Sequence, residues 1–280
     1  MSYFIEDSSL NPGFGPAFSK DKVLYSKKSR YQHIEVFENR VWGKVLVLDG
    51  LVMFSEKDEF VYHEMISHVP MAVSYAKRIL IIGGGDGGAA KELVKYPSVE
   101  KIDIVEIDED VPKVSKDLFP YVASALDSDK VNLKIQDGAD FVSSAKRSDR
   151  YDLIIVDSTD PIGPGERLFT EDFFSSCKRL LSLDGIMVSQ SEAPFLYPEQ
   201  VMGISKKLKK IFPISKFYMY NMPTYPSGLW LFGFSSKKLH PINDLKEKEW
   251  EALGIKTRYY NTKLHRAAFA LPNFMRALTE

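Results

Sequence analysis

The glycine-rich segment 83–88 contains an acidic residue, Asp86, where a phosphate-binding loop would avoid negative charge. It follows the apolar run 78–82 and precedes residues 89–94, which have helix-forming composition, so the segment predicts a strand, a tight turn and a helix. A pyrophosphate would lie at the start of that helix, where a carboxylate ~4 Å away repels it by about 4 kcal/mol. The turn therefore favours a cationic ligand, such as a nucleoside with a sulfonium tail.

The glycines Gly83, Gly85 and Gly88 also satisfy the spacing G-x-G-x-x-G of dinucleotide-binding loops. Glu106 ends the next apolar strand and suits a bidentate hold on ribose hydroxyls, whatever the rest of the ligand is. The glycine spacing alone is a weak signal, and Asp86 argues against NAD. A nucleoside with a positive tail is therefore expected, and an NAD-dependent dehydrogenase is the last alternative.

Acidic residues follow two more apolar runs of the sequence. Asp137 comes after residues 131–135, and Asp157 comes after residues 151–156. Because the carboxyl ends of parallel strands meet at one edge of a sheet, both side chains are expected beside Glu106. A single acid at such a place commonly starts a turn or caps a helix, but several together favour a binding site.

Asp137 and its neighbour Gly138 allow two interpretations. The carboxylate could accept a hydrogen bond from the exocyclic amine of adenine, while Gly138 leaves room for the ring. Alternatively, Asp137 could cap a helix expected from Asp140 onward.

Asp157 and Asp160 lie three residues apart in a loop whose path is restricted by Pro161 and Pro164. Carboxylates so placed could bind a divalent metal, act as an acid–base pair or hold an alkylammonium group. A metal is the weakest of these interpretations, because no cluster of Cys and His accompanies the pair. Asp86 adds a third acid with no cationic partner in its motif. These acids are therefore expected to raise one another's pKa unless a cationic ligand binds.

Two further segments are candidates for walls of the same site. Tyr62 and His63 lie in a helix expected over residues 57–72, and Tyr225 lies in an aromatic loop over residues 223–230. Tyrosine rings can pack on a methylene chain and face an ammonium group. Each of these side chains could equally belong to the core, and His63 alone is typical of a polar helix residue.

The elements that position these residues fall into two units. Alternating residues between 23 and 54 predict a small antiparallel sheet, and the helix over 57–72 leads out of it. From Arg78 onward, apolar strands alternate with helical segments, which is typical of a parallel sheet with helices on both faces. The later strands are expected at 101–105, 131–135, 151–156 and 185–188, with another, antiparallel at one side, at 229–234.

Composition excludes several classes of protein. The chain has 37 Lys and Arg against 38 Asp and Glu, so no overall charge attracts nucleic acid or an anionic membrane. No apolar run approaches the ~20 residues that span a bilayer, and the N-terminus lacks the features of a signal peptide. The single Cys177 cannot form an internal disulfide. A reducing, cytoplasmic location is therefore expected.

On these residues, the chain resembles the spermidine synthase family, the putrescine aminopropyltransferases of bacterial type, from about Tyr3 to Leu278. The likeness is specific because many spaced motifs agree. They lie at residues 31–37, 58–65, the glycine loop with Asp86, 105–108, 157–164, 225–230, 259–261 and 265–269. Two positions depart from the family pattern, since Met53 stands where many members carry Gln and Tyr3 replaces a usual Trp. Met53 puts a polar contact near the substrate in doubt.

The resemblance implies an α/β fold with a Rossmann-like catalytic domain of the methyltransferase type at residues 73–280. An N-terminal β-sheet domain with the connecting helix would occupy residues 1–72. It also implies transfer of the aminopropyl group of decarboxylated S-adenosylmethionine to putrescine, giving spermidine and 5′-methylthioadenosine. The donor is a co-substrate, so no permanently bound cofactor and no metal are expected. A homodimer or homotetramer is implied, with neither nucleic acid nor membrane as a partner.

By the family pattern, Asp157 would orient and deprotonate the attacking amine. Gln32 and Glu106 would meet the ribose hydroxyls or nearby polar atoms, while His63 and Asp86 would hold the aminopropyl amine. The donor residues would be Gln32, His63, Asp86, Glu106, Asp137, Gly138 and Pro164, the last three around adenine, and the acceptor residues would be Tyr62, Asp157, Asp160 and Tyr225.

Asp86 would also select the donor, because it repels the carboxylate of full S-adenosylmethionine. Three alternatives stay open. One is an S-adenosylmethionine-dependent methyltransferase on the same scaffold. Another is an aminopropyltransferase acting on agmatine, cadaverine or spermidine. The third is a noncatalytic nucleoside- or polyamine-binding protein.

Overall fold

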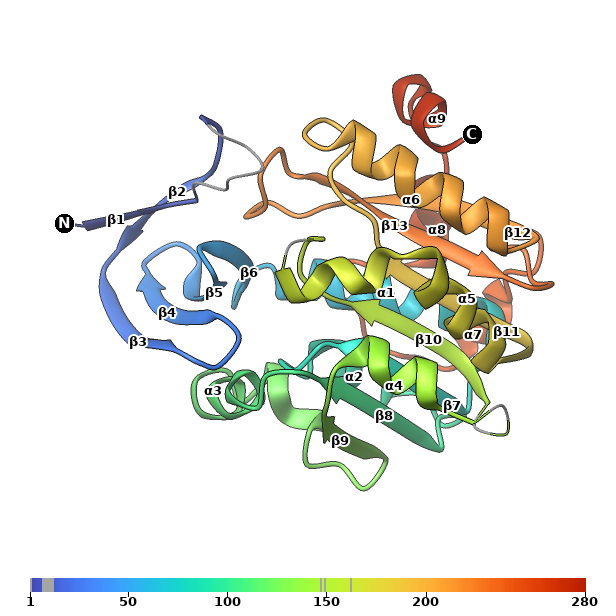
Figure 1. Ribbon diagram of the computed structural model, residues 1–280, viewed down its shortest axis with the longest axis horizontal. Coiled ribbons are helices and arrows are strands. Elements are labelled where there is room, and N and C mark those ends of the chain that lie inside the picture. Colours follow the sequence, from blue (N-terminus) through green and yellow to red (C-terminus); the bar gives the residue numbers. More distant parts are fainter. Residues whose placement is uncertain (1, 7–12, 147, 149, 162) are drawn as a thin grey trace.

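The N-terminal part of the chain forms two antiparallel sheets. The computed structural model describes residues 2–6, 13–146, 148, 150–161 and 163–280 (Figure 1). Strands β1 (Ser2–Ile5) and β2 (Ala17–Lys20) pair with each other, and a four-stranded sheet with the order β3-β4-β5-β6 follows. Its strands are β3 (Lys22–Lys28), β4 (His33–Asn39), β5 (Gly43–Leu48) and β6 (Leu51–Ser55). The antiparallel sheet predicted between residues 23 and 54 is confirmed, whereas the alternation does not predict β1 and β2.

Helix α1 (Glu59–Ser74) then leads into a seven-stranded sheet with the order β12-β13-β11-β10-β7-β8-β9. Strands β7 to β11 are parallel, and β13 pairs antiparallel with both β11 and β12. This confirms the mostly parallel sheet with an antiparallel strand at one side. The strands are β7 (Arg78–Gly83), β8 (Lys101–Glu106), β9 (Val131–Ile135), β10 (Tyr151–Asp157), β11 (Leu181–Gln190), β12 (Ile214–Asn221) and β13 (Leu229–Ser236).

Helices cover both faces of this sheet, as predicted (Figure 1). Successive residues of a strand point to opposite faces, so Ile79 and Ile81 belong to one core with α1, while Leu80 and Ile82 belong to a second. The remaining helices are α2 (Gly88–Leu93), α3 (Asp110–Leu118), α4 (Gly138–Ser144), α5 (Glu171–Leu180), α6 (Pro198–Ile211), α7 (Glu247–Ala252), α8 (Thr262–Ala268) and α9 (Asn273–Thr279), with short 3₁₀ helices η1 (Val122–Ala125) and η2 (Gly163–Phe169). None of them, within the described ranges, combines the length and apolar character that crossing a membrane requires.

Helix α1 is buried along nearly its whole length because it lies between the two units. Val61 and Met65 share one core with Ile34 and Phe54 of the N-terminal sheet and with the large sheet. The helix thus joins both units, and the domain boundary at residues 72 and 73 stays a prediction.

The carboxylate of Glu64, on α1, anchors the C-terminal part of the chain. It is 2% exposed and accepts hydrogen bonds from the backbone N–H groups of Arg258 at 2.7 Å, Tyr259 at 2.7 Å and Tyr260 at 2.8 Å. Removing it would leave the buried N–H of Tyr260 and two partly buried N–H groups without this partner, which destabilises a protein more than the loss of an exposed contact does.

We expect Glu64→Ala to lower the free energy of unfolding by about 3 kcal/mol, because charge-assisted hydrogen bonds are lost from a buried place. Glu100→Ala is the control, since Glu100 forms an exposed ion pair with Lys77, and a change below about 1 kcal/mol is expected there. Urea denaturation measures both. Equal destabilisation by the two substitutions would refute the anchoring role.

Candidate active site

The glycine loop lies close to the ends of β8 and β10. Gly83 has a φ of +79°, and a Cβ there would lie 2.0 Å from the carbonyl oxygen of Asp157. A Cβ on Gly85 would lie 2.7 Å from Oε2 of Glu106. These two glycines are therefore required by the close approach of neighbouring strands and not by a phosphate group.

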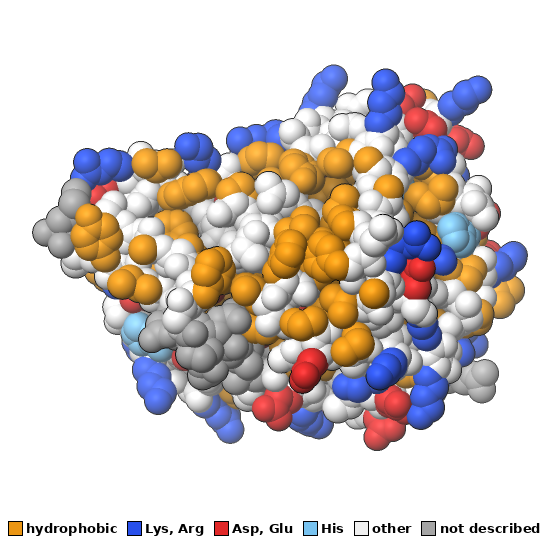
Figure 2. All heavy atoms as spheres, turned by 90° about the horizontal axis from the view of Figure 1, so that it is seen from above, with side chains coloured by type: hydrophobic (Ala, Val, Ile, Leu, Met, Phe, Trp, Pro, Cys, Tyr) orange, Lys and Arg blue, Asp and Glu red, His pale blue; other side chains and the backbone are white. Residues whose placement is uncertain are grey.

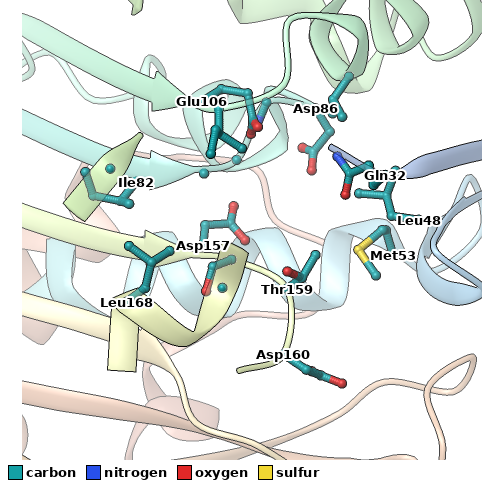
Figure 3. A pocket seen from close by; sticks show the side chains of 18 of the residues that line it. Gln32, Leu48, Met53, Ile82, Asp86, Glu106, Asp157, Thr159, Asp160 and Leu168 are labelled. Atoms are coloured by element: carbon teal, nitrogen blue, oxygen red, sulfur yellow. The ribbon is translucent and has the colours of Figure 1, made fainter. Parts of the chain in front are cut away.

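A cavity of about 490 Å³ opens at this edge of the sheet, between the strand ends and the four-stranded N-terminal sheet (Figure 3). It brings together every predicted site residue whose side chain the structure describes. Its lining includes Gln32, Tyr62, His63, Asp86, Glu106, Asp137, Gly138, Asp157, Asp160 and Tyr225. The side chain of Pro164 lies outside the described residues, so its place near adenine stays a prediction.

Glu106, at the end of β8, is buried and already holds two backbone groups. Its Oε1 accepts from the N–H of Asp108 at 2.9 Å, and its Oε2 accepts from the N–H of Gly85 at 3.2 Å. Burial, assisted by the charges of Asp108 and Asp86, raises the pKa of Glu106 to about 7. Each oxygen keeps a further lone pair, so this carboxylate can still accept hydroxyl donors from the cavity.

Gln32 reaches the cavity from the segment before β4, and Asp108 fixes its position. The side-chain amide of Gln32 donates to Oδ2 of Asp108 at 3.0 Å, and the hydroxyl of Ser29 donates to the same oxygen at 2.6 Å. The amide oxygen of Gln32 stays available to a ligand. This role of Asp108 could not be predicted from the motif at 105–108, because the partner is 76 residues away in the chain.

Asp137 is the N-cap of α4, which confirms the second of the two interpretations. Its Oδ1 accepts from the N–H groups of Ala139 at 2.8 Å and Asp140 at 3.0 Å, and its Oδ2 accepts from Arg167 at 2.7 Å. The helix begins at Gly138, two residues before the expected start. A contact between Asp137 and adenine stays a prediction.

Asp157, at the end of β10, has the properties of a general base. Its Oδ1 accepts a hydrogen bond from the hydroxyl of Tyr62 at 2.8 Å, and its buried Oδ2 has no partner among the described residues. Burial and the nearby charge of Asp86 raise the pKa of Asp157 to about 7. A pKa near the working pH and a buried oxygen without a protein partner are features that suit proton removal.

Asp86 differs from the sequence-based expectation because it has a cationic partner. The Nε2 atom of His63 lies 3.4 Å from Oδ1 of Asp86, which also accepts from the N–H of Gly88 at 2.6 Å. Although burial opposes it, the charge and hydrogen bond of His63 lower the pKa of Asp86. The expectation of an unpaired acid with a raised pKa was therefore wrong, because the partner comes from α1, far from the glycine motif.

His63 is in turn held between two carboxylates. Its Nδ1 lies 2.6 Å from Oε2 of Glu59, one helical turn earlier on α1. Although burial opposes protonation, Asp86 and Glu59 together raise the pKa of His63 to about 10. Its predicted contact with the donor amine stays a prediction.

A smaller pocket of about 40 Å³ adjoins the cavity beyond Asp160 and contains further acids. Burial raises the pKa of Asp160 to about 6, and burial raises that of Glu6, which follows β1, to about 7. Gln190 donates to Oδ1 of Asp160 at 3.2 Å and to Oε1 of Glu192 at 3.1 Å. Burial also raises the pKa of Glu192 well above its usual range.

Glu6, Gln190 and Glu192 are absent from the sequence-based site. Gln190 and Glu192 lie at the carboxyl end of β11, another parallel strand, so the rule used for Glu106 and Asp157 would have indicated them. Glu6 carries no such signal, because β1 is not predicted.

Aromatic rings line the part of the cavity near Asp160. The rings of Tyr62 and Tyr225 lie 6.3 Å apart, and Trp230 packs edge-on to Tyr225 at 5.1 Å. The hydroxyl of Tyr225 donates to the carbonyl oxygen of Met53 at 2.6 Å, and the side chain of Met53 lies near Gln32 (Figure 3). The tyrosines are therefore both walls of the cavity and neighbours of the core.

The charge of the whole site is strongly acidic. Among the described residues that line the two pockets there is no Lys or Arg, and the cation present is His63. Within the same residues, no group of three or more His, Cys, Asp or Glu side chains is arranged to hold a metal ion. The cavity therefore suits cationic organic molecules.

An acidic, nucleoside-sized cavity at the carboxyl edge of such a sheet defines an α/β enzyme with a methyltransferase-like fold. Residues 59–247 match the family model described as the spermine/spermidine synthase domain, and residues 2–56 match the spermidine synthase tetramerisation domain. The chain therefore belongs to the spermine/spermidine synthase family and is an aminopropyltransferase.

Similar proteins cover nearly the whole chain. It is 50% identical over 281 residues to the polyamine aminopropyltransferase of Clostridioides difficile (strain 630), with 99% of this chain and 98% of the relative covered. It is 48% identical over 267 residues to the same-named protein of Alkaliphilus metalliredigens, with coverages of 94% and 93%.

Two solved structures share the fold along the full length. A spermidine synthase in complex with the transition-state analogue AdoDATO has a TM-score of 0.96 and 38% identity. The spermidine synthase of Thermotoga maritima has a TM-score of 0.93 and 36% identity. Each match covers 99% of this chain and 94% of the other.

The raised pKa values predict that the ligand-free protein loses stability as pH rises from about 4.5 to about 7. Glu6, Glu106 and Asp157 keep their protons in the folded state up to about pH 7, whereas in the unfolded chain they lose them near 4.5 or 3.8. The folded state therefore binds more protons in this interval, so the free energy of unfolding falls with pH. His265, whose pKa burial lowers to about 4, opposes this trend with a single proton.

Urea denaturation at several pH values between 5 and 8 measures this trend. Glu6→Gln should make the slope shallower, because it removes one of the raised groups, and the exposed Glu100→Gln is the matched control. A free energy of unfolding that rises with pH over this interval would be inconsistent with the assigned pKa shifts.

Proposed function

We propose that this protein transfers the aminopropyl group of decarboxylated S-adenosylmethionine to putrescine, giving spermidine and 5′-methylthioadenosine. The observation that carries the proposal is that Asp86 and Asp157 extend into one cavity in different states (Figure 3). Asp86 is kept ionised by a cation, whereas Asp157 has a pKa near 7 and an oxygen without a protein partner. The names of the relatives and the bound AdoDATO of a structural neighbour support the same reaction.

The donor would lie along the glycine loop. Glu106 and Gln32 would accept and donate hydrogen bonds at the ribose, and Asp137 with Gly138 would surround adenine. The aminopropyl ammonium would then meet Asp86, and His63 behind it. A carboxylate at that place, as in full S-adenosylmethionine, would be repelled, which argues against the methyltransferase alternative.

The chemical step would be an in-line substitution at the methylene next to the sulfonium sulfur. The amine nitrogen forms the new C–N bond while the C–S electron pair returns to sulfur, which leaves a neutral thioether. An alkylammonium such as Lys has a pKa of about 10.4, so the acceptor must first lose a proton. Oδ2 of Asp157 would take that proton, while the Tyr62 hydroxyl holds the other oxygen in place. Alignment of both ligands supplies proximity.

The acceptor would extend from Asp157 into the smaller pocket. Tyr62 and Tyr225 would pack on its methylenes, and Asp160 and Glu6 would surround the distal ammonium. A volume of about 40 Å³ is space for a few water-sized groups, since one water needs roughly 10–15 Å³ on this scale. It suits one terminal ammonium with a methylene or two and not the additional aminopropyl group of spermidine. The pocket therefore favours a short diamine.

We also propose a homo-oligomer, with the N-terminal sheets as one contact. Tyr3 and Ile5 are 62% and 64% exposed on β1, within the segment matched by the tetramerisation model. Figure 2 shows further hydrophobic side chains gathered on the face seen from above. The dimer and the tetramer both remain compatible with this arrangement, and the cytoplasmic location stays a prediction.

Substitution of the two key carboxylates should separate catalysis from donor binding. Asp157→Asn should lower kcat by about 10²–10⁴ with little change in donor affinity, because it removes the proton acceptor. Glu106→Gln should weaken donor binding by roughly tenfold or more, because it removes a charge-assisted hydrogen bond. Release of 5′-methylthioadenosine and calorimetric titration of the donor measure the two quantities. Equal effects of both substitutions on both quantities would contradict the assigned roles.

A mass-spectrometric survey of products tests the acceptor. With decarboxylated donor, putrescine should give the highest kcat/KM among putrescine, cadaverine, agmatine and spermidine, because of the short pocket. Asp160→Asn should raise the KM for putrescine more than it lowers kcat, because Asp160 lines both pockets. Spermidine as the best acceptor would overturn the proposed length preference, and methylated amine formed from S-adenosylmethionine would establish the methyltransferase alternative. No 5′-methylthioadenosine from any amine would indicate the noncatalytic binding protein.

A further inference from the structure

Behind the donor cavity, four charged side chains form a continuous chain. Nζ of Lys91 lies 2.8 Å from Oε1 of Glu59, and Oε2 of Glu59 lies 2.6 Å from Nδ1 of His63. Nε2 of His63 then lies 3.4 Å from Oδ1 of Asp86. Lys91, Glu59 and His63 are only 6%, 1% and 2% exposed, so their interactions are shielded from solvent. The charges alternate in sign along this chain, from the Lys91 cation on α2 to the Asp86 carboxylate that faces the cavity.

The His63 ring cannot turn away from this chain. A Cβ on Gly88 would lie 2.2 Å from Cε1 of the ring, so the glycine loop packs directly against it. The rings of Phe54 and Tyr62 pack against it edge-on at 5.9 Å and 5.6 Å. The doubly protonated imidazolium suits both carboxylates, because Nδ1 then donates to Glu59 and the positive charge lies 3.4 Å from Asp86 at Nε2.

We propose that Glu59, itself anchored by Lys91, is a positioning residue that holds His63 as an imidazolium, and that this cation keeps Asp86 ionised beside Asp157. The effect of Asp86 on the choice of donor rests on the proposed function, whereas the charge state of His63 is independent of it.

In this arrangement the His63 cation has a specific role in an otherwise acidic cavity. An imidazolium has no lone pair, so His63 cannot accept a hydrogen bond from the aminopropyl ammonium and acts on it through Asp86. Without that cation, Asp86 would lie among like charges and take up a proton more readily. A neutral Asp86 would no longer repel the carboxylate of S-adenosylmethionine, so Glu59 contributes to the choice of donor.

The pKa shifts agree with the geometry. His63 and Lys91 lower the pKa of Glu59 despite its burial, and the pKa of His63 is raised to about 10. The charge of His63 also lowers the pKa of Asp157, against the opposite effects of burial and of Asp86. The titratable or charged groups around His63 and Asp86 are Glu59 and Tyr62 on α1, Lys91 and Glu92 on α2, Glu106 on β8, Asp157 on β10 and Tyr225 in the loop before β13.

A second buried pair offers a matched control. Nε2 of His68 lies 2.9 Å from Oε2 of Glu92, and these residues are 0% and 2% exposed. The other ring nitrogen of His68 meets the hydroxyl of Tyr96, and neither His68 nor Glu92 lines the cavity. Oε1 of Glu92 also lies 3.7 Å from Nζ of Lys91, so Glu92→Gln removes a buried carboxylate from a histidine and from Lys91 but leaves the contacts of His63 with Glu59 and Asp86 in place.

The direct test is NMR of the ligand-free protein with isotope-labelled histidine. In the unmodified protein the His63 ring should stay doubly protonated from pH 6 to pH 9. Glu59→Gln should bring its deprotonation into that interval, whereas Glu92→Gln and the charge-conserving Glu59→Asp should leave it protonated. A neutral His63 ring at pH 7.5 in the unmodified protein would overturn the proposal, as would an unchanged titration in Glu59→Gln.

Kinetics supply the second readout. Glu59→Gln should reduce the preference for decarboxylated over full S-adenosylmethionine by about tenfold, equivalent to one pKa unit, whereas Glu92→Gln should not. His63→Gln should shift the acidic limb of the kcat/KM profile to higher pH, because Asp157 loses a nearby cation. An unmoved limb would refute the link to Asp157. If Glu59→Gln does not fold, the titration of the unmodified protein and of Glu59→Asp still decides the charge state, and that result is independent of the proposed reaction.

Discussion

The repulsion between carboxylates at one sheet edge is the constraint on which the rest of the structure depends. Glu106 and Asp157 arrive there because parallel strands end at the same edge, and the glycine loop lets them approach within contact of its backbone. Gathering several anions in a partly buried cavity is unfavourable unless each is protonated, paired or matched by a bound cation. The described lining contains no Lys or Arg, although Arg167, outside it, pairs with Asp137 at 2.7 Å.

The carboxylates are accommodated differently at the two ends of the cavity, which are the proposed donor end and the proposed acceptor end. At the donor end, Asp86 is paired with His63 and stays ionised, so an ammonium finds a charge that is already formed. At the acceptor end, the pKa values of Asp160 and Glu6 are raised, so protons are held until a cationic ligand displaces them. Asp157 lies between the two, and burial together with the charge of Asp86 raises its pKa to about 7 against the opposite effect of His63. One acidic cavity therefore contains both a permanent anion and a proton acceptor.

Much of this arrangement could be predicted from the sequence, because the rules involved are local or topological. Apolar runs ending in Glu106 and Asp157 indicate strands, and parallel strands deliver their ends to one place. The features of the site that the sequence does not predict depend on contacts between distant segments. His63 pairs with Asp86 across 23 positions of the chain, and Gln32 with Asp108 across 76. Glu6 and Gln190 are absent from the predicted site, because β1 has no clear alternation and the strand expected at 185–188 continues to Gln190.

Helix α1 explains why residues 58–65 form so dense a motif. The helix is buried all round, so each of its faces meets a different neighbour. Glu59 and His63, one turn apart, face the glycine loop, while Tyr62 faces Asp157. Glu64 holds the backbone of the C-terminal segment, and Asp58, just before the helix, accepts from Thr224 beside Tyr225. A shift of this single helix would therefore disturb Asp86, Asp157 and the Tyr225 loop together. Because these contacts share one rigid element, α1 fixes the positions of Asp86, Asp157 and the Tyr225 loop relative to one another.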